Sequence, residues 1–187
     1  IMKNSIKELL RLEVEAIQNI PVNDSFENAV DIIKNYVHSS EKNGKVVLSG
    51  MGKAGQIALN ISTTLSSTGT PSVYLHPSEA QHGDLGILCK DDVLILLSNS
   101  GKTREILELI ELSKNMYPHI SIICITGKKD SPLAKKSDIV YNAIMKFTEG
   151  SFRNRVFVAP DIPAKKLVNA QSKYITRNEP IVVLIDD

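Results

Sequence analysis

Small hydroxyl residues follow an apolar run in the segment 91–101, which reads DDVLILLSNSG. A continuous Val/Ile/Leu run is typical of a buried parallel strand, and ligands of open α/β sheets bind beyond the carboxyl ends of the strands. The turn after this run offers hydroxyls, an amide and backbone N–H groups at the start of a helix, which suits an anion; its residues are Ser98, Asn99, Ser100, Gly101 and Thr103. The alternative is an ordinary turn with a Ser or Thr helix cap.

A glycine-rich turn follows an earlier apolar run, at Ser49–Gly55. Its three glycines have the spacing G-x-G-x-x-G, which alone is a weak indication of a dinucleotide site. No acidic residue follows the next short strand to hold a ribose, since the chain has His76 there, and the turn lacks the Ser or Thr of a Walker loop. Lys53 in this turn either neutralises negative charge in a site or is a solvated lysine.

Acid–base side chains crowd the segment 75–86, LHPSEAQHGDLG. A loop this polar between apolar strands contributes little to a hydrophobic core, and it is rich in groups that can transfer protons. His76 and His82 lack the helical i, i+4 spacing of a metal pair and have no evident further ligands, so we expect no required metal. One of the two histidines is equally explained as a structural hydrogen bonder. Glu105 stands one helical turn beyond the Ser-Asn-Ser turn and either faces that site or stabilises the helix dipole.

The elements that position these residues alternate between strand and helix along the chain. Such alternation indicates right-handed βαβ crossovers, and we predict a doubly wound, flavodoxin-like α/β fold with three α/β/α layers and a central five-stranded parallel sheet. The expected strands are 45–49, 71–75, 92–97, 120–125 and 138–143, and the expected helices are 5–19, 25–39 (capped by Ser25), 56–67, 103–114 and 131–136.

Length and composition limit the function further. The chain has 187 residues, 42% of them hydrophobic, and a net charge of +1, which disfavours a nucleic-acid surface. No apolar stretch reaches the ~20 residues of a membrane span, and the N-terminus does not have the pattern of a secretory signal. Without C-x-x-C spacing, Cys89 and Cys124 favour buried, reduced thiols in a cytoplasmic protein. We expect one domain over 1–149 and a separate strand–helix–strand tail over 150–187.

Taken together, these segments resemble the sugar isomerase (SIS) domain, and most of all the arabinose 5-phosphate isomerase family that feeds Kdo (3-deoxy-D-manno-octulosonate) synthesis. The resemblance covers about residues 3–145. It rests on the strings GMGKAG (50–55), STGTPS (67–72), HPSEAQHGDLG (76–86), SNSGKTRE (98–105) and ICITG (123–127).

The resemblance implies interconversion of D-arabinose 5-phosphate and D-ribulose 5-phosphate through a cis-enediol, without a cofactor, in a homodimer or homotetramer with sites shared between subunits. It implies Glu105 as proton-transfer base, Lys53 as charge stabiliser and His82 as the ring-opening or hydroxyl-binding group. His76 and His82 would hold any inhibitory zinc. The implied substrate-binding residues are Ser49, Gly50, Gly69, Thr70, His76, Ser98, Asn99, Ser100, Gly101 and Thr103. The implied role is the supply of precursors for lipopolysaccharide, capsule or another surface polysaccharide.

The sequence departs from that family after its last predicted strand. The family's Lys-Glu-Ala-x-Pro segment and its late histidine have no match here, nor do the paired cystathionine-β-synthase modules of longer members. The family's second glutamate would fall near residues 146–149, where the alignment is not secure. A second hypothesis therefore stands beside the enzyme: a non-catalytic SIS module that senses a phosphosugar or a nucleotide-activated sugar. An SIS enzyme for another phosphosugar is a third, which the HPSEAQHGDLG string disfavours.

Overall fold

The computed structural model describes residues 22–142 without a break and eight positions before them. Those eight are Ile6, Lys7, Leu10, Arg11, Val14, Ile17, Gln18 and Ile20, and all but Ile20 are helical. The chain divides into two units, and the one that spans Val22–Ala143 contains the whole sheet. The predicted tail elements at 150–187, the boundary after residue 149 and much of the predicted helix 5–19 lie outside the described residues.

Five parallel strands form the sheet, in the order β2-β1-β3-β4-β5. They are β1 (Val46–Gly50), β2 (Ser72–Tyr74), β3 (Val93–Leu97), β4 (Ser121–Thr126) and β5 (Ile139–Asn142). Each boundary falls within one residue of its prediction. Three of the five strands, β1, β3 and β4, are buried along almost their whole length, as their apolar runs predict. The parallel α/β fold is therefore confirmed, with the strand order of flavodoxin-like sheets.

One face of the sheet packs against α5 (Arg104–Met116) and α6 (Pro132–Lys136). Val47 pairs with Leu94, and Leu94 pairs with Ile122, so their side chains point to the same face. These residues share one buried cluster with apolar side chains of both helices, namely Ile106, Leu109, Ile110, Leu133 and Ala134. The buried hydrophobic residues of α5 thereby fix how this helix packs on the sheet and where its N-terminus lies.

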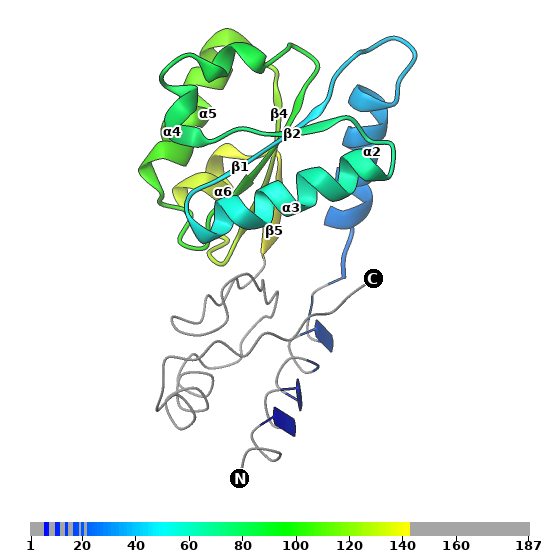
Figure 1. Ribbon diagram of the computed structural model, residues 1–187, viewed down its shortest axis with the longest axis vertical. Coiled ribbons are helices and arrows are strands. Elements are labelled where there is room, and N and C mark those ends of the chain that lie inside the picture. The colour runs from blue at the N-terminus through cyan, green and yellow to red at the C-terminus, as the bar shows by residue number, and fades with distance from the viewer. Residues whose placement is uncertain are drawn as a thin grey trace. The chain divides into compact units, whose positions relative to one another are not determined.

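The opposite face carries α3 (Lys53–Ser67) and α2 (Ser25–Val37), as Figure 1 shows. Helix α3 lies over β1, β2 and β3, and α2 lies over β3 and β5. The Phe26 ring meets the Tyr141 ring edge-on at 4.9 Å, and the Tyr141 hydroxyl donates to the Ser25 carbonyl at 2.8 Å. Helices on both faces complete the three predicted layers.

Helix α3 begins three residues earlier than predicted, at Lys53. Gly52 adopts φ +56° and turns the chain directly from β1 into the helix. Gly55, predicted in the loop, lies in the first turn of α3, where an added Cβ would come within 2.5 Å of the Gly50 carbonyl oxygen and 2.7 Å of the Tyr74 hydroxyl. This last glycine therefore allows helix and strand to approach closely, one of the roles such glycines have in phosphate-binding turns.

Three further predictions need correction. Ser25 is the first residue of α2 and not its cap; the Asn23 side chain accepts from both its N–H (3.0 Å) and its hydroxyl (2.6 Å). The predicted loop at 75–86 contains α4 (Pro77–Ala80) and the start of a 3-10 turn (Asp84–Ile87). Cys124 is buried as expected, but Cys89 is exposed, because it follows the buried Leu88 on the way into β3; both thiols are free.

At the amino edge of the sheet, Lys45 and Asp92 form an ion pair with an Nζ–Oδ2 distance of 2.7 Å. The Asp92 carboxylate is fully buried and also accepts the N–H groups of Lys45 and Cys89 at 2.9 and 2.8 Å. The Lys45 ammonium donates a further bond to the Ile87 carbonyl at 2.7 Å. This edge therefore joins the start of β1 to the chain that enters β3, with its charges satisfied.

No helix within the described part of the chain is long and apolar enough to cross a bilayer.

Candidate functional site

The predicted site residues divide between the two edges of the sheet. Gly50 at the end of β1 pairs with Leu97 at the end of β3, and Leu97 pairs with Ile125 in β4. The turns that follow β1, β3 and β4 therefore meet at the carboxyl edge. The chain leaves β1 for β2 on one side and later enters β3 on the other, so the first two of these turns flank the topological switch point, where open α/β sheets bind ligands.

Hydroxyl groups organise the turn after β3. The Ser98 hydroxyl lies 2.7 Å from the Thr103 hydroxyl and accepts the Gly101 N–H at 3.1 Å. The Ser100 hydroxyl accepts the Lys102 N–H at 3.2 Å. Gly101 adopts φ +60°, a conformation that a side chain disfavours. The five residues predicted as an anion site thus form one compact turn.

The turn after β4 holds this turn from the side. The Gly127 N–H donates to the Asn99 carbonyl at 3.0 Å, and the Leu133 N–H donates to the Gly101 carbonyl at 3.1 Å. A Cβ on Gly101 would lie 2.0 Å from the Ser131 hydroxyl oxygen. Ser131 in turn caps α6 by accepting the Ala134 N–H. The geometry of the Ser98–Thr103 turn is therefore set by a neighbouring strand as well as by its own sequence.

Helix α5 begins at this turn with its first donors unused. Thr103 is the N-cap but makes no side-chain cap bond. In the part of the chain that the structure describes, the N–H groups of Arg104, Glu105 and Ile106 have no acceptor, and the same holds for those of Asn99 and Ser100. Such groups at a helix start need a partner, and together with the helix dipole they favour a bound anion.

Lys53 is the exposed first residue of α3, on the other side of the switch point. Its ammonium makes no ion pair or hydrogen bond with any described residue, in contrast to Lys45. Behind it, the buried Ser49 hydroxyl donates to the Leu75 carbonyl at 2.7 Å, and the Gly50 carbonyl accepts from Tyr74 at 3.0 Å. Ser49 and Gly50 therefore join β1 to β2 below the site, and their polar side-chain and carbonyl atoms are already occupied.

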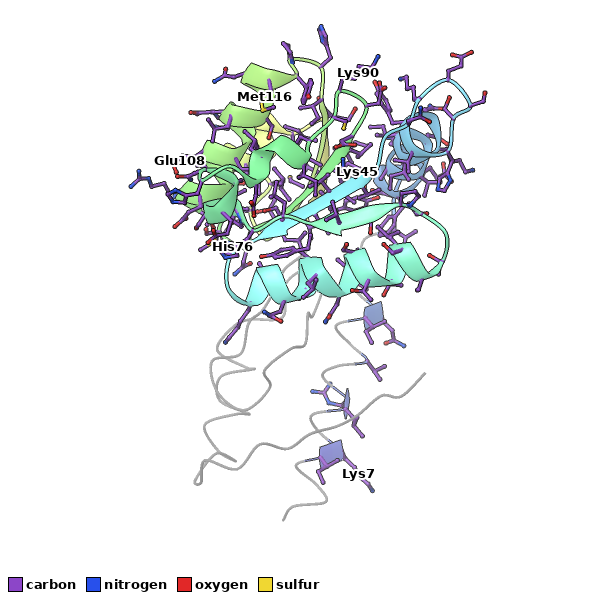
Figure 2. All side chains as sticks on the ribbon, turned by 45° about the horizontal axis from the view of Figure 1, so that its top comes forward. Lys7, Lys45, His76, Lys90, Glu108 and Met116 are labelled. Carbon is purple, nitrogen blue, oxygen red and sulfur yellow. The ribbon has the colours of Figure 1, made fainter. Side chains whose placement is uncertain are left out.

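His76 follows β2 at the same edge, and Figure 2 shows it away from Lys45 and Lys90, which lie toward the other end of the sheet. Its Nδ1 atom is buried and is the one such side-chain N or O atom without a hydrogen-bond partner among the described residues. The ring lies edge-on to Tyr74 with 6.4 Å between centroids. Burial raises the pKa of Tyr74, so its hydroxyl stays a neutral donor to Gly50 at physiological pH.

His82 and Glu105 come from the two elements beside that edge. His82 is exposed in the turn between α4 and the 3-10 segment, and Glu105 is half-buried in the first turn of α5. Helix α4 packs against α5, so the fold brings the two segments together. No group of three or more His, Cys, Asp or Glu side chains is placed to hold a metal ion within the described residues; inhibitory zinc at His76 and His82 stays a prediction.

Gly69 and Thr70 lie at the opposite, amino edge of the same sheet. They precede β2, whose first residue, Ser72, pairs with Val46 at the start of β1. A five-residue strand rises about 3.3 Å per residue, which separates this edge from the Ser98 turn. The Thr70 hydroxyl bonds His38 Nε2 at 3.0 Å there. One chain alone therefore does not place Gly69 and Thr70 with the other predicted site residues.

A network that the sequence analysis did not identify links α4 to α5. The Gln81 amide donates to Glu108 Oε2 at 2.7 Å, and Arg104 Nε donates to Glu108 Oε1 at 2.6 Å. The Arg104 guanidinium holds the pKa of the Glu108 carboxyl below its usual value, with a smaller contribution from Gln81. The i, i+4 spacing of Arg104 and Glu108 could have been recognised in the sequence. The bond to Gln81 could not, because Gln81 lies 27 residues before Glu108 in a separate element.

Comparison with known proteins identifies the family. The model of the SIS domain matches residues 40–157. Arabinose 5-phosphate isomerase KdsD of Pseudomonas aeruginosa is 40% identical over 142 residues, which are 75% of this chain and 41% of the relative. The chain thus spans about two fifths of the length of the curated relatives it matches.

Two solved structures are similar over more of their length. A candidate phosphosugar isomerase involved in capsule formation from Bacteroides fragilis is 60% identical with a TM-score of 0.73, covering 75% of this chain and 72% of that one. A protein of Escherichia coli CFT073, solved in complex with arabinose 5-phosphate, is 34% identical with a TM-score of 0.64, covering 94% of this chain and 93% of that one.

Proposed function

Since this chain belongs to the SIS-domain family, we propose that it is an isomerase that interconverts D-arabinose 5-phosphate and D-ribulose 5-phosphate. The observation that carries the proposal is the Ser98–Thr103 turn, where hydroxyls and unpaired N–H groups precede α5 at the switch point of the sheet. The E. coli relative solved with arabinose 5-phosphate supports this choice of substrate, as do the KdsD relatives. The alternative is an SIS module that binds a phosphosugar as a signal.

The phosphate group fits the turn after β3. Its oxygens would accept from the Ser100 hydroxyl and from the unpaired N–H groups at the start of α5. Lys102 is exposed beside the turn, with no ion pair to a described residue, and adds positive charge there. Because these donors are held by the neighbouring Thr126–Ser131 segment, binding requires little rearrangement of the turn.

The sugar carbons then extend toward the residues that move protons. Aldose–ketose isomerisation removes the C2 proton of the open-chain aldose, passes through a cis-enediolate, and returns a proton to C1, with no net change in composition. We assign Glu105 as the base that carries this proton. Lys53 stabilises the negative charge that develops on the sugar oxygen, while His82 opens the ring or binds a hydroxyl and His76 lines the sugar.

A second copy of the chain completes this arrangement in the proposal. Gly69 and Thr70 lie at the other edge of their own sheet, so they reach a substrate only from a neighbouring subunit. A homodimer or homotetramer with shared sites satisfies this requirement. We place the reaction in the cytoplasm, in precursor supply for a surface polysaccharide such as capsule. The B. fragilis relative, which is involved in capsule formation, supports the choice of capsule.

Proton NMR in deuterated water tests the reaction directly. We expect D-arabinose 5-phosphate to convert to D-ribulose 5-phosphate with deuterium entering at the carbon that receives the proton. Glu105→Gln should lower kcat by about a thousandfold without a loss of melting temperature. Glu111→Gln is the matched control and should keep its activity, because Glu111 lies on the same helix and its one partner among the described residues is Lys136 at the surface.

The same experiment separates the enzyme from the sensor. If D-arabinose 5-phosphate raises the melting temperature but neither turnover nor deuterium exchange occurs, the chain binds without catalysis and the isomerase assignment is wrong. Turnover of a hexose phosphate in preference to the pentose phosphate would instead correct the substrate. Full activity in Glu105→Gln would remove that residue from the proton-transfer role.

A further inference from the structure

Glu108 connects the two segments that carry the proposed proton-transfer groups. Its Oε2 atom accepts from the Gln81 amide at 2.7 Å, and Gln81 directly precedes His82. Its Oε1 atom accepts from Arg104 at 2.6 Å, and Arg104 directly precedes Glu105. Glu105 and Glu108 are three residues apart on α5 and therefore share a side of that helix.

The rest of the segment 78–86 has few polar links to the fold. Its backbone hydrogen bonds are local, from Ala80 to His76, from Gln81 to Ser78, from His82 to Glu79 and from Gly86 to Gly83. Its other polar side-chain contact to a separate element, among the described residues, is a 3.8 Å approach of the Ser78 hydroxyl to the Met51 sulfur. Among the described residues, the bond from Gln81 to Glu108 is thus the strong polar tether of this segment.

Packing alone does not fix the turn that carries His82. Ala80 before it is buried in the core and Leu85 after it packs against the core, but the four residues between them, from Gln81 to Asp84, are exposed. Gly83, in the middle of the turn, adopts φ +125°, with nothing within 4 Å of an added Cβ. A short exposed turn with a glycine at positive φ has low intrinsic order, so a charge-assisted hydrogen bond at Gln81 has a large effect on where His82 lies.

We propose that Glu108 is a positioning residue that holds the His82 turn against α5 and so sets the distance between His82 and Glu105. Its carboxylate reaches both segments at once, with one oxygen on each. The inference rests on the isomerase function proposed above for its catalytic meaning, but the tether itself is independent of that function.

Hydrogen exchange and kinetics of three variants test this role. Glu108→Leu removes both acceptors, Glu108→Gln keeps an amide oxygen that accepts from Gln81, and Glu111→Leu removes a comparable surface ion pair of the same helix. We expect Glu108→Leu to exchange the amides of 81–86 about tenfold faster than wild type. We expect its kcat/KM for D-arabinose 5-phosphate to fall about tenfold, mainly through kcat.

The controls define the outcome. Glu111→Leu should match wild type in both measurements, and Glu108→Gln should recover most of the kcat that Glu108→Leu loses. Exchange in Glu108→Leu no faster than in Glu111→Leu overturns the proposal, as does faster exchange with an unchanged kcat in an active enzyme. If the wild type has no isomerase activity, the proposed function is wrong, and the exchange rates alone decide whether Glu108 holds the turn.

Discussion

The polar groups at the amino edge of the sheet are hydrogen-bonded and paired with one another, whereas many of those at the carboxyl edge have no partner among the described residues. At the amino edge, Asp92 is fully buried and its carboxylate accepts from Lys45 and from two backbone N–H groups. At the carboxyl edge, five N–H groups around the Ser98 turn have no acceptor within the described chain, and Lys53 has no anionic partner there.

This difference separates polar groups that hold the fold together from those available to a ligand. A buried charge is tolerated only when it is paired and hydrogen-bonded, which the amino edge satisfies internally. Donors left open at a helix start, next to an uncommitted lysine, are satisfied by water or by an anion from outside. The location of the open groups at the switch point favours the anion.

The two lysines offer the strongest test of this contrast. Lys45→Met leaves the buried Asp92 carboxylate without its cation, and we expect a loss of about 3 kcal/mol in the free energy of unfolding. Lys53→Met removes a solvated side chain, so its free energy of unfolding should stay within about 0.5 kcal/mol of wild type. Its kcat/KM should fall about a hundredfold, which corresponds to about 2.7 kcal/mol in the activation free energy. Urea unfolding and the isomerase assay measure both quantities.

An inverted result would break the comparison. If Lys53→Met were the less stable variant, or if Lys45→Met lost turnover while still fully folded, the assignment of structure to one edge and chemistry to the other would be wrong. Lys90→Met serves as a neutral reference, because Lys90 is exposed and its nearest carboxylate oxygen, on Asp91, is 4.0 Å away.

Two glycines at positive φ, one at each edge, give a second and smaller test. Gly101 has φ +60° and no room for a Cβ beside Ser131, whereas Gly69 has φ +90° with nothing within 4 Å. We expect Gly69→Ala to cost about 1 kcal/mol from backbone strain alone. Gly101→Ala should cost about 2–3 kcal/mol, since the clash adds to the strain.

The effect of inorganic phosphate on the melting temperature of these two glycine variants tests which edge binds the anion. It should raise the melting temperature of wild type and of Gly69→Ala by equal amounts, because inorganic phosphate occupies the turn after β3 and lacks the sugar that Gly69 of a neighbouring copy would contact. The shift should vanish in Gly101→Ala. A full phosphate shift in a folded Gly101→Ala protein would show that the turn after β3 does not hold the anion.

The sequence predicts the sheet well because each strand is a dense apolar run, such as VLILL in β3, bounded by polar or glycine residues. It also predicts the residues of the Ser98 turn. The start of α3 was missed because a positive φ at Gly52 compresses the turn, and nothing local to the sequence distinguishes that glycine from Gly50. The tether from Gln81 to Glu108 joins residues from separate elements, so it appears only when α4 and α5 are packed together.

The placement of Gly69 and Thr70 shows a different limit. Their position before β2 puts them at the amino edge of a parallel sheet. The family resemblance compares motifs along the sequence and does not say at which edge of the sheet each motif lies. Resemblance grouped them with Ser98 and Lys53, and the register of β1 with β2 separates them within one chain. A site that needs both sets of residues therefore depends on assembly, which local pattern does not encode.

The smallest effect is expected from the surface pair of Arg104 and Glu108, and it sharpens the contrast with the buried pair. Arg104 holds the pKa of Glu108 below its usual value. A carboxyl with a lowered folded pKa adds stability above its unfolded pKa, and this contribution is lost as the pH falls through the folded pKa. Wild type should therefore be slightly more stable than Glu108→Gln at neutral pH, with the difference vanishing at acid pH. Because both side chains contact solvent, added salt should also reduce it. Thermal unfolding of both proteins across that pH range measures the difference in stability, and a difference that stays constant through the acid range would contradict an ionic contribution from the Arg104–Glu108 pair.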